Sequence, residues 1–275
     1  MTTLKGPTKP PARQERARQF SLPLYLLIVF ALSWPFQIAY VVLGDPYRPL
    51  LLVSMVMAGV ATFLCGRFVF ADGFARAGWR WGRPRHYVYG FLLALFLWLA
   101  PSIIERMLGI YEPTQDWTPG GLLTLFLGGF AATMIPAFGE EFSWRGYLLP
   151  RLFTRSGVKR ALLLHGLITW LWHLPVVVVL GLSAGSNPAI WIPLVLFVSL
   201  IPTVMHAIVF AYIWSASNSL TVVTFYHICF DEVRDALEGS VGLGPLAQNF
   251  QMVALTVLGL VALFRARWKT HVSQT

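Results

Sequence analysis

Residues 120–150 read GGLLTLFLGGFAATMIPAFGEEFSWRGYLLP, a long apolar run that ends in a cluster of charges. Residues 120–138 contain no ionisable side chain, and then Glu140, Glu141 and Arg145 follow within six residues. About 20 apolar residues suffice for a helix to cross a lipid bilayer. A charge near the bilayer centre costs about 2.5–3.5 kcal/mol even on a lenient scale, so charges there usually serve a function. The stretch therefore predicts a membrane-spanning helix with a functional site near its end.

The whole chain has the composition of an integral membrane protein. Of its 275 residues, 56% are hydrophobic and only 12% are charged, and the mean hydropathy is +0.64. Soluble domains carry about 25% charged residues. The net charge of +9 does not indicate a nucleic-acid partner, because the basic residues stand in short clusters between apolar runs. Cys65 and Cys229 lie far apart in apolar segments, so they predict neither a disulfide framework nor a metal site.

Eight segments are long and apolar enough to cross a bilayer about 30 Å thick. The seventh is the least hydrophobic, and no internal repeat relates them. We expect an all-α polytopic membrane protein with about eight transmembrane helices and both termini in the cytoplasm. The segments comprise residues 21–43, 49–66, 87–104, 120–144, 160–181, 190–213, 218–236 and 248–264.

The basic residues predict the orientation of these helices. With a cytoplasmic N-terminus, 18 of the 21 lysines and arginines fall on the cytoplasmic side, as the positive-inside rule requires. We expect residues 1–20 to form a disordered basic cytoplasmic tail, residues 21–264 a single transmembrane domain, and residues 265–275 a second basic cytoplasmic tail. The style of the sequence favours a multi-pass protein of a bacterial plasma (inner) membrane.

Two cytoplasmic connectors combine apolar residues with arginines. Residues 68–86 read FVFADGFARAGWRWGRPRH, and residues 148–160 read LLPRLFTRSGVKR. Segments of this kind lie in the headgroup region of a bilayer and bind anionic lipid. We therefore expect both connectors to be amphipathic surface segments.

The two adjacent glutamates differ in the partners that a helix offers them. Each residue of an α-helix turns by about 100°, so Glu141 and Arg145 point about 40° apart and can form an ion pair, whereas Glu140 points about 100° away from Glu141. A charged helix end with an internal salt bridge explains Glu141 and Arg145. It does not explain Glu140, which has no local partner. Glu140 is therefore the candidate functional carboxylate.

Two histidines on other helices are expected near Glu140. Counted from the cytoplasmic face, His173 lies about 20 Å deep and His227 about 14 Å deep, so both can meet Glu140 in the cytoplasmic half of the membrane. Asp231 follows His227 by one helical turn and can hold its ring. The sequence therefore predicts a polar site in which three helices meet.

Other residues of these helices carry weaker signals. His165 and His206 are expected to be buried interhelical hydrogen-bonding residues, which is the usual role of a lone histidine in an apolar helix. Pro136 and Pro175 are expected to kink their helices and to open space near the site.

Together these residues resemble the CPBP (CAAX protease and bacteriocin-processing, Abi) family, which includes the type II CAAX prenyl endopeptidases. The resemblance rests on E-E-x-x-x-R at residues 140–145, on W-H-L-P around His173, and on H-x-x-x-[ND] at His227 and Asp231. It covers a core at about residues 118–236. It implies an all-helical intramembrane endopeptidase that acts near the cytoplasmic side of the membrane, with water activated by a glutamate.

The resemblance also gives each residue of the site a role. By this resemblance, Glu140 would be the general base and His173 would position the water. His227 with Asp231 would stabilise the oxyanion, and the ion pair of Glu141 and Arg145 would support the site.

Two positions depart from the pattern of the family. Thr169 stands four residues before His173, where relatives often carry an aromatic residue. Asp231 stands where the prenyl proteases have asparagine. An ionised aspartate cannot donate a hydrogen bond to an oxyanion, so Asp231 is either protonated or serves to orient His227.

We expect no cofactor. Two histidines and a glutamate could hold a catalytic zinc ion with one open position, but the sequence lacks the H-E-x-x-H helix of many zinc proteases. A mechanism without metal is therefore favoured, and a zinc-dependent one is the alternative. The expected partners are a peptide or protein substrate, with or without a lipid modification, and the bilayer, but no nucleic acid.

Two other functions compete with the peptidase. A non-catalytic immunity or scaffold protein could keep the fold without the chemistry, and Thr169 and Asp231 leave that interpretation open. A proton-coupled transporter also uses buried glutamate and histidine, but such folds often show inverted repeats and pairs of broken helices, of which the sequence shows neither. The peptidase is favoured, the scaffold comes next, and the transporter comes last.

Overall fold

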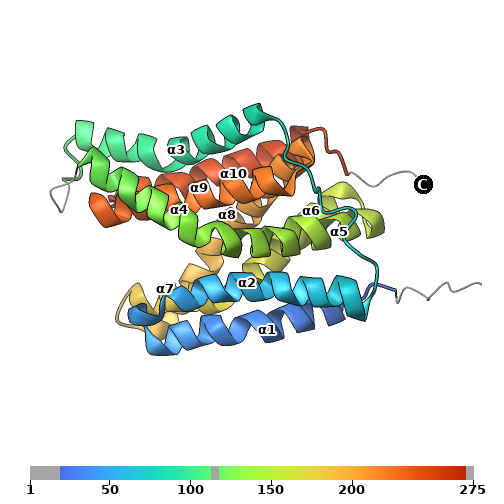
Figure 1. Cartoon of the computed structure of the whole chain (residues 1–275). Helices are drawn as coiled ribbons and strands as arrows, with labels where there is room; N and C mark the ends of the chain where they lie inside the picture. The colour runs from blue at the N-terminus through green and yellow to red at the C-terminus, as the bar shows by residue number, and fades with distance from the viewer. Residues whose placement is uncertain (1–18, 113–117, 271–275) are drawn as a thin grey trace, which may run out of the picture.

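The computed structural model describes residues 19–112 and 118–270, and these ranges form a bundle of helices without any strand (Figure 1). The regular helices begin with α1 and end with α10. Their bounds are α1 Leu22–Leu43, α2 Pro49–Leu64, α3 Pro84–Met107, α4 Pro119–Glu141, α5 Leu149–Arg155, α6 Val158–Trp172, α7 Leu174–Ser183, α8 Pro188–Ser217, α9 Leu220–Ser240 and α10 Pro245–Arg265.

Three short elements complete the list. A 3-10 turn, η1, comprises Asp45–Tyr47 between α1 and α2. Two π-helical segments extend longer helices: η2 comprises Cys65–Val69 at the end of α2, and η3 comprises Phe142–Leu148 between α4 and α5. Because η3 joins α4 to α5 without a break, Pro119–Arg155 is one helical rod of 37 residues.

Each of the eight predicted segments coincides with a helix, and the chain is an all-α, multi-pass membrane protein. Six helical spans of the described chain are long and apolar enough to cross a membrane, and the bent pair α6–α7 makes a seventh. The eighth predicted segment is α9, which carries five charged side chains, too many for a simple apolar span. This helix is instead packed against α3 and α4.

The bend between α6 and α7 measures 57° and falls at His173. Pro175 lies in the first turn of α7, where a residue without a backbone N–H is tolerated, and it cannot continue the hydrogen bonds of α6. The predicted kink at Pro175 is therefore confirmed. By contrast, α4 continues through Pro136 as one helix.

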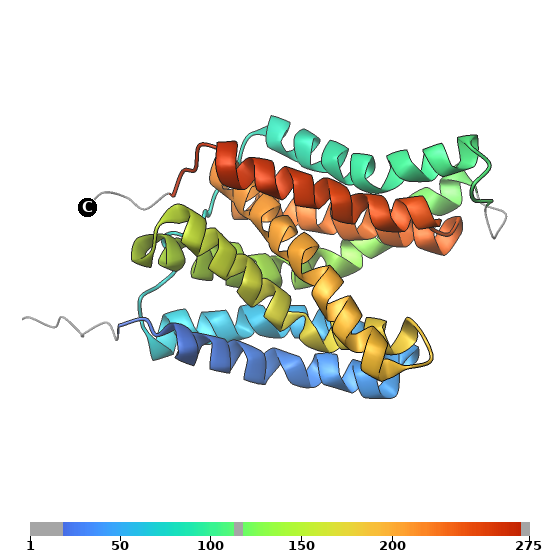
Figure 2. The same cartoon turned by 180° about the vertical axis from the view of Figure 1, so that it is seen from behind.

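The helices are arranged around an internal space. In both views, α1 and α2 lie together on one side of the bundle and α3, α9 and α10 on the other, while α4 and α8 pass between them (Figures 1 and 2). The beginning of α1 and the end of α10 lie at the same end of the bundle, which we call the terminal end. This agrees with both termini lying on one side of the membrane, and the cytoplasmic assignment of that side stays a prediction.

The two connectors combine exposed residues, as predicted for surface segments, with residues buried in the protein. Residues 148–160 are mostly helical, because α5 continues the rod of α4, and Leu149 and Leu152 are buried in the protein. Residues 70–83 contain no helix, and Phe70 and Ala77 are buried. Both connectors are therefore packed against the bundle, because their apolar residues find a protein partner there.

Helices α2 and α4 approach each other closely at two glycines. A Cβ atom added to Gly59 would lie 2.7 Å from the Cα atom of Gly139, and one added to Gly139 would lie 2.9 Å from the carbonyl oxygen of Met55. Small residues let membrane helices approach in this way. Gly139 directly precedes Glu140, so this contact fixes the position of the glutamates against α2.

We predict that Gly59→Ala destabilises the protein by about 1–3 kcal/mol, because the added methyl group meets backbone that cannot move aside cheaply. The control is Gly128→Ala on α4, where no heavy atom lies within 4 Å of the added Cβ. Melting temperatures in detergent, followed by tryptophan fluorescence, test the pair. Equal melting temperatures for the two variants would show that the contact is not tight.

Candidate active site

Glu141 is the most firmly held ionisable side chain of the site. Its side chain is fully buried, and its Oε1 atom accepts a hydrogen bond of 2.8 Å from Nη1 of Arg145, itself buried. The same oxygen lies 2.8 Å from Nδ1 of His227 on α9. The predicted ion pair within the helix is therefore confirmed. The contact with His227 was not predicted.

Glu140 is buried as well, with 4% of its surface exposed, but it makes no hydrogen bond or salt bridge to any other residue of the described ranges. It lines an internal cavity of about 660 Å³, whereas Glu141 does not. The helix therefore does what the spacing predicts: it directs one carboxylate to an arginine and the other into open space.

His227 lies between two carboxylates. Its Nδ1 atom faces Glu141, and its Nε2 atom lies 3.3 Å from Oδ2 of Asp231, one helical turn further along α9. The prediction that Asp231 holds this ring is confirmed. A histidine can donate from both nitrogens only when the ring is protonated. The surroundings of His227 therefore favour an imidazolium ion.

Asp231 has a second partner of opposite charge. Nη1 of Arg234 lies 3.3 Å from Oδ1 of Asp231, and Nε of Arg234 lies 2.7 Å from Asp235. With a protonated His227, the ion pairs join three carboxylates to four cations. The carboxylates belong to Glu141, Asp231 and Asp235, and the cations to Arg48, Arg145, Arg234 and His227. Buried charge is tolerated when it is paired in this way.

His173 lies at the break between α6 and α7 and lines the same cavity. Its Nδ1 atom lies 2.8 Å from the carbonyl oxygen of Thr169. A carbonyl only accepts hydrogen bonds, so Nδ1 carries a proton, and in the neutral ring Nε2 is left as an acceptor. The hydroxyl of Thr169 donates to the carbonyl of His165, at 3.0 Å. Thr169 thus orients His173 through its backbone.

The structure shows contacts of the site that the sequence did not reveal. Arg145 lines the cavity in addition to binding Glu141, and its guanidinium carbon lies 4.2 Å from the centre of the Phe210 ring. His206 also lines the cavity, and its Nε2 atom lies 3.1 Å from the hydroxyl of Tyr226, as expected for an interhelical hydrogen bond. His165 is fully buried outside the cavity lining. A sequence shows which residues are one helical turn apart, whereas these contacts join residues of separate helical segments, so the sequence could not predict them.

The cavity reaches from the glutamates to the end of the bundle opposite the terminal end. Its lining includes Arg48 in the α1–α2 connection, Asp235 near the end of α9 and Gln251 near the beginning of α10. Arg48 and Asp235 form an ion pair of 3.3 Å at this rim. Under the predicted orientation, the rim faces the external side. The expectation that the chemistry takes place near the cytoplasmic side stays a prediction.

Three side chains of the site lie close enough together to serve as ligands of one metal ion. The ligand atoms of Glu140, Glu141 and His227 all lie within 4.8 Å of one another. This set contains Glu141 instead of His173, which the zinc alternative would use. Glu141 and His227 already bond to each other, so a metal ion would have to replace that hydrogen bond. The expectation that no metal is needed stays a prediction.

Comparisons with known proteins agree with this site. Residues 120–233 match the family described as type II CAAX prenyl endopeptidase Rce1-like, a range that contains every residue predicted for the site. The chain is also 29% identical, over 156 residues, to CAAX prenyl protease 2 of Methanococcus maripaludis. That alignment covers 56% of this chain and 51% of the relative, so the chain spans about half the length of the relative. The predicted resemblance to the CPBP family is confirmed by this match over residues 120–233.

We predict that Arg145→Met destabilises the fold by about 3–5 kcal/mol, because it leaves the buried Glu141 carboxylate without its cation. The double variant Arg145→Met, Glu141→Gln should recover part of this loss, since it removes both charges. Arg160→Met, at an exposed position of α6, serves as the control, with an expected change below about 0.5 kcal/mol. Equilibrium unfolding in mixed micelles measures all three, and an Arg145→Met variant as stable as the control would contradict the buried pair.

Proposed function

We propose that the chain is an intramembrane endopeptidase in which Glu140 activates a water molecule for hydrolysis of a peptide bond. One observation carries the proposal: Glu140 is a buried carboxylate without a partner among the described residues, and it faces a cavity that His173 and His227 also line. A general base has to be free to accept a proton and close to the water that it activates. Glu140 forms no hydrogen bond or salt bridge with the described residues and faces the cavity, whereas Glu141 is paired with Arg145 and lies outside the cavity lining.

In the proposed reaction, water binds between Glu140 and Nε2 of His173, which accepts a hydrogen bond from it. Glu140 takes one proton while the water oxygen bonds to the carbonyl carbon of the substrate, and the carbonyl oxygen becomes negatively charged. The carbon–nitrogen bond then breaks, and Glu140 passes its proton to the departing amine. No covalent bond to the enzyme forms in this sequence, because the nucleophile is water.

We assign stabilisation of the oxyanion to His227. Its Nε2 atom is 3.3 Å from Asp231, which is longer than the usual 2.7–2.9 Å of a charge-assisted hydrogen bond. The N–H at this nitrogen is therefore the less firmly engaged one and can turn to a developing oxyanion. Asp231 faces cations with both oxygens, which supports the role of a positioning residue that keeps His227 protonated and in place. Arg145 adds a second positive charge to the cavity wall.

The lining of the cavity supports a substrate with apolar groups. Besides the polar cluster, the wall contains apolar side chains from three helices, α2, α7 and α10, and a peptide with apolar side chains or a lipid modification would be in contact with them. These side chains are Leu51, Leu52, Met55, Val177, Leu180, Met252 and Leu255. We therefore propose that the substrate is a peptide or protein that reaches Glu140 through this cavity. The membrane in which the chain resides stays a prediction.

We predict that Glu140→Gln lowers the rate of peptide cleavage by at least about 100-fold, because glutamine cannot accept the proton. The matched control is Glu238→Gln, an exposed position on α9 outside the cavity lining, which should keep its activity. Purified protein in detergent, a pooled peptide library and mass spectrometry measure the rates, with and without a chelator.

Three results would change the proposal. Unchanged cleavage by Glu140→Gln would exclude this carboxylate as the base. Loss of wild-type cleavage with the chelator would favour the zinc-dependent alternative. Absence of cleavage by wild-type protein that is folded, across a broad library, would favour the non-catalytic scaffold.

The role of Asp231 has its own test. We predict that Asp231→Asn lowers kcat by less than about 10-fold, because the amide oxygen can still accept from His227, whereas Asp231→Leu lowers it by about 100-fold or more through loss of the oriented donor. KM should change little in both variants. A large loss in Asp231→Asn would contradict a positioning role and indicate that the acid itself takes part in proton transfer.

A further inference from the structure

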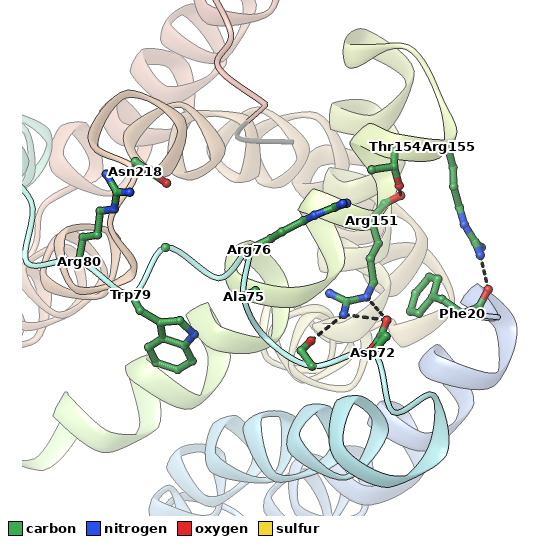
Figure 3. A pocket seen from close by; sticks show the side chains of 12 residues that line it. Phe20, Asp72, Ala75, Arg76, Trp79, Arg80, Arg151, Thr154, Arg155 and Asn218 are labelled. Carbon is green, nitrogen blue, oxygen red and sulfur yellow. Dashed lines mark hydrogen bonds and ion pairs between the residues drawn. The ribbon is translucent and has the colours of Figure 1, made fainter. Parts of the chain in front are cut away.

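A second cavity, of about 750 Å³, lies at the terminal end of the bundle and is lined mainly by polar and basic groups (Figure 3). Its walls come from the ends of elements. Phe20 precedes α1, Asn218 caps α8, Arg155 ends α5, and residues 72–80 belong to the connector between η2 and α3. Because helix ends meet the membrane surface, this cavity lies at the level of lipid headgroups. It shares only the α4–α5 rod with the catalytic residues.

The cavity carries an excess of positive charge. Four arginines line it, and Asp72 is the only acidic residue among its lining residues. Asp72 is already neutralised, since Arg151 lies 2.8 Å from it and also donates to the carbonyl oxygens of Gly73 and Tyr147. Three guanidinium charges remain without an acidic partner in the described ranges, and they belong to Arg76, Arg80 and Arg155.

Of these three arginines, Arg76 and Arg80 are available for a ligand. Arg155 is already engaged, because it donates to the carbonyl oxygen of Phe20 and lies over its ring. The side chains of Arg76 and Arg80 form no hydrogen bond or salt bridge with the described residues. In Figure 3, Arg76 extends across the cavity toward Arg151 and Thr154, and Arg80 lies beside Asn218. Both free guanidinium groups therefore border the same hollow.

The connector that presents them is fixed in place. The indole N–H of Trp214 donates to the carbonyl of Ala77 at 3.1 Å, and the backbone N–H of Leu220 donates to that of Gly78 at 2.8 Å. Gly78 has a φ of +84°, and a Cβ there would lie 3.0 Å from the Trp214 indole nitrogen, so only glycine fits. Ser219 and Thr221 donate to the carbonyl of Arg80. A fixed backbone on both sides of the arginines reduces the entropy lost when they bind.

We propose that this cavity binds phosphate groups, with Arg76 and Arg80 as separate contacts at its two ends. Guanidinium groups bind phosphate through paired N–H donors, and the excess of three charges suits an anion. The phosphate can belong to the headgroup of an anionic phospholipid or be free in solution. Trp79, which is 55% exposed beside the cavity, is a typical residue of the lipid interface and favours the headgroup. The proposal is independent of peptidase activity.

The first experiment measures binding of lipid to the full chain. Native mass spectrometry of the purified protein gives the retention of phosphatidylglycerol and, as the neutral reference, phosphatidylcholine. We expect Arg76→Gln, Arg80→Gln to lose at least 10-fold in apparent affinity for phosphatidylglycerol. The matched control is Arg83→Gln, Arg85→Gln, which removes the same charge from the neighbouring positions, outside the cavity lining, and should lose less than 3-fold. Equal losses in the two pairs would overturn the site, since general attraction to anionic lipid would explain them.

The second experiment separates the two sources of phosphate. Inorganic phosphate is titrated against lipid-depleted protein, and the melting temperature is followed. A preference for phosphatidylglycerol over phosphatidylcholine identifies a lipid headgroup, and a rise in melting temperature at millimolar phosphate that is lost in Arg76→Gln, Arg80→Gln identifies free phosphate. No response in either arm overturns the proposal. If the glutamine pair does not fold, Arg76→Lys, Arg80→Lys keeps the charge but loses the paired donors, and its affinity should fall about 3- to 10-fold.

Discussion

The arrangement of the centre of the protein depends on two hydrogen bonds of the Glu141 carboxylate, one with Arg145 and one with His227. They join Arg145 in η3 and His227 on α9 to the end of α4, and all three side chains are buried. A buried charge has to be paired, so the three segments cannot separate without a large loss of stability. The orientation of Glu140 follows, because its helix is held on one side by these bonds and on the other by the contact of Gly139 with α2.

This arrangement also explains why α9 can carry so many charges inside a membrane protein. Each of its acidic or basic side chains near the cavity has a partner within the protein: Asp231 faces His227 and Arg234, and Asp235 faces Arg234 and Arg48. Buried Glu232 accepts from the hydroxyl of Thr133 on α4. The charges of α9 near the cavity are therefore directed to the cavity and to α4.

Much of the fold could be predicted because a bilayer makes strict demands on sequence. Each crossing needs a long apolar run, which made the helices that could cross the membrane visible, and the i,i+4 spacing was enough to pair Glu141 with Arg145 and His227 with Asp231. The hydrogen bond between Glu141 and His227 joins residues 86 positions apart, and no local pattern encodes it. The π-helical turn of η3 and the burial of Phe70 and Ala77 in the connector depend on tertiary contacts, so the sequence alone did not predict them.

Under the proposed function, the cavity would also act as a molecular ruler. His227 marks its catalytic end and Asp235 its rim, and both lie on α9, eight residues apart. At 1.5 Å per residue this is about 12 Å, which an extended peptide of about 3.3–3.6 Å per residue crosses with three to four residues. A chain that enters at the rim with its end leading would therefore present its third or fourth bond to Glu140. The depth of a pocket between helices can in this way set where a substrate is cut, without any residue reading the sequence of the substrate.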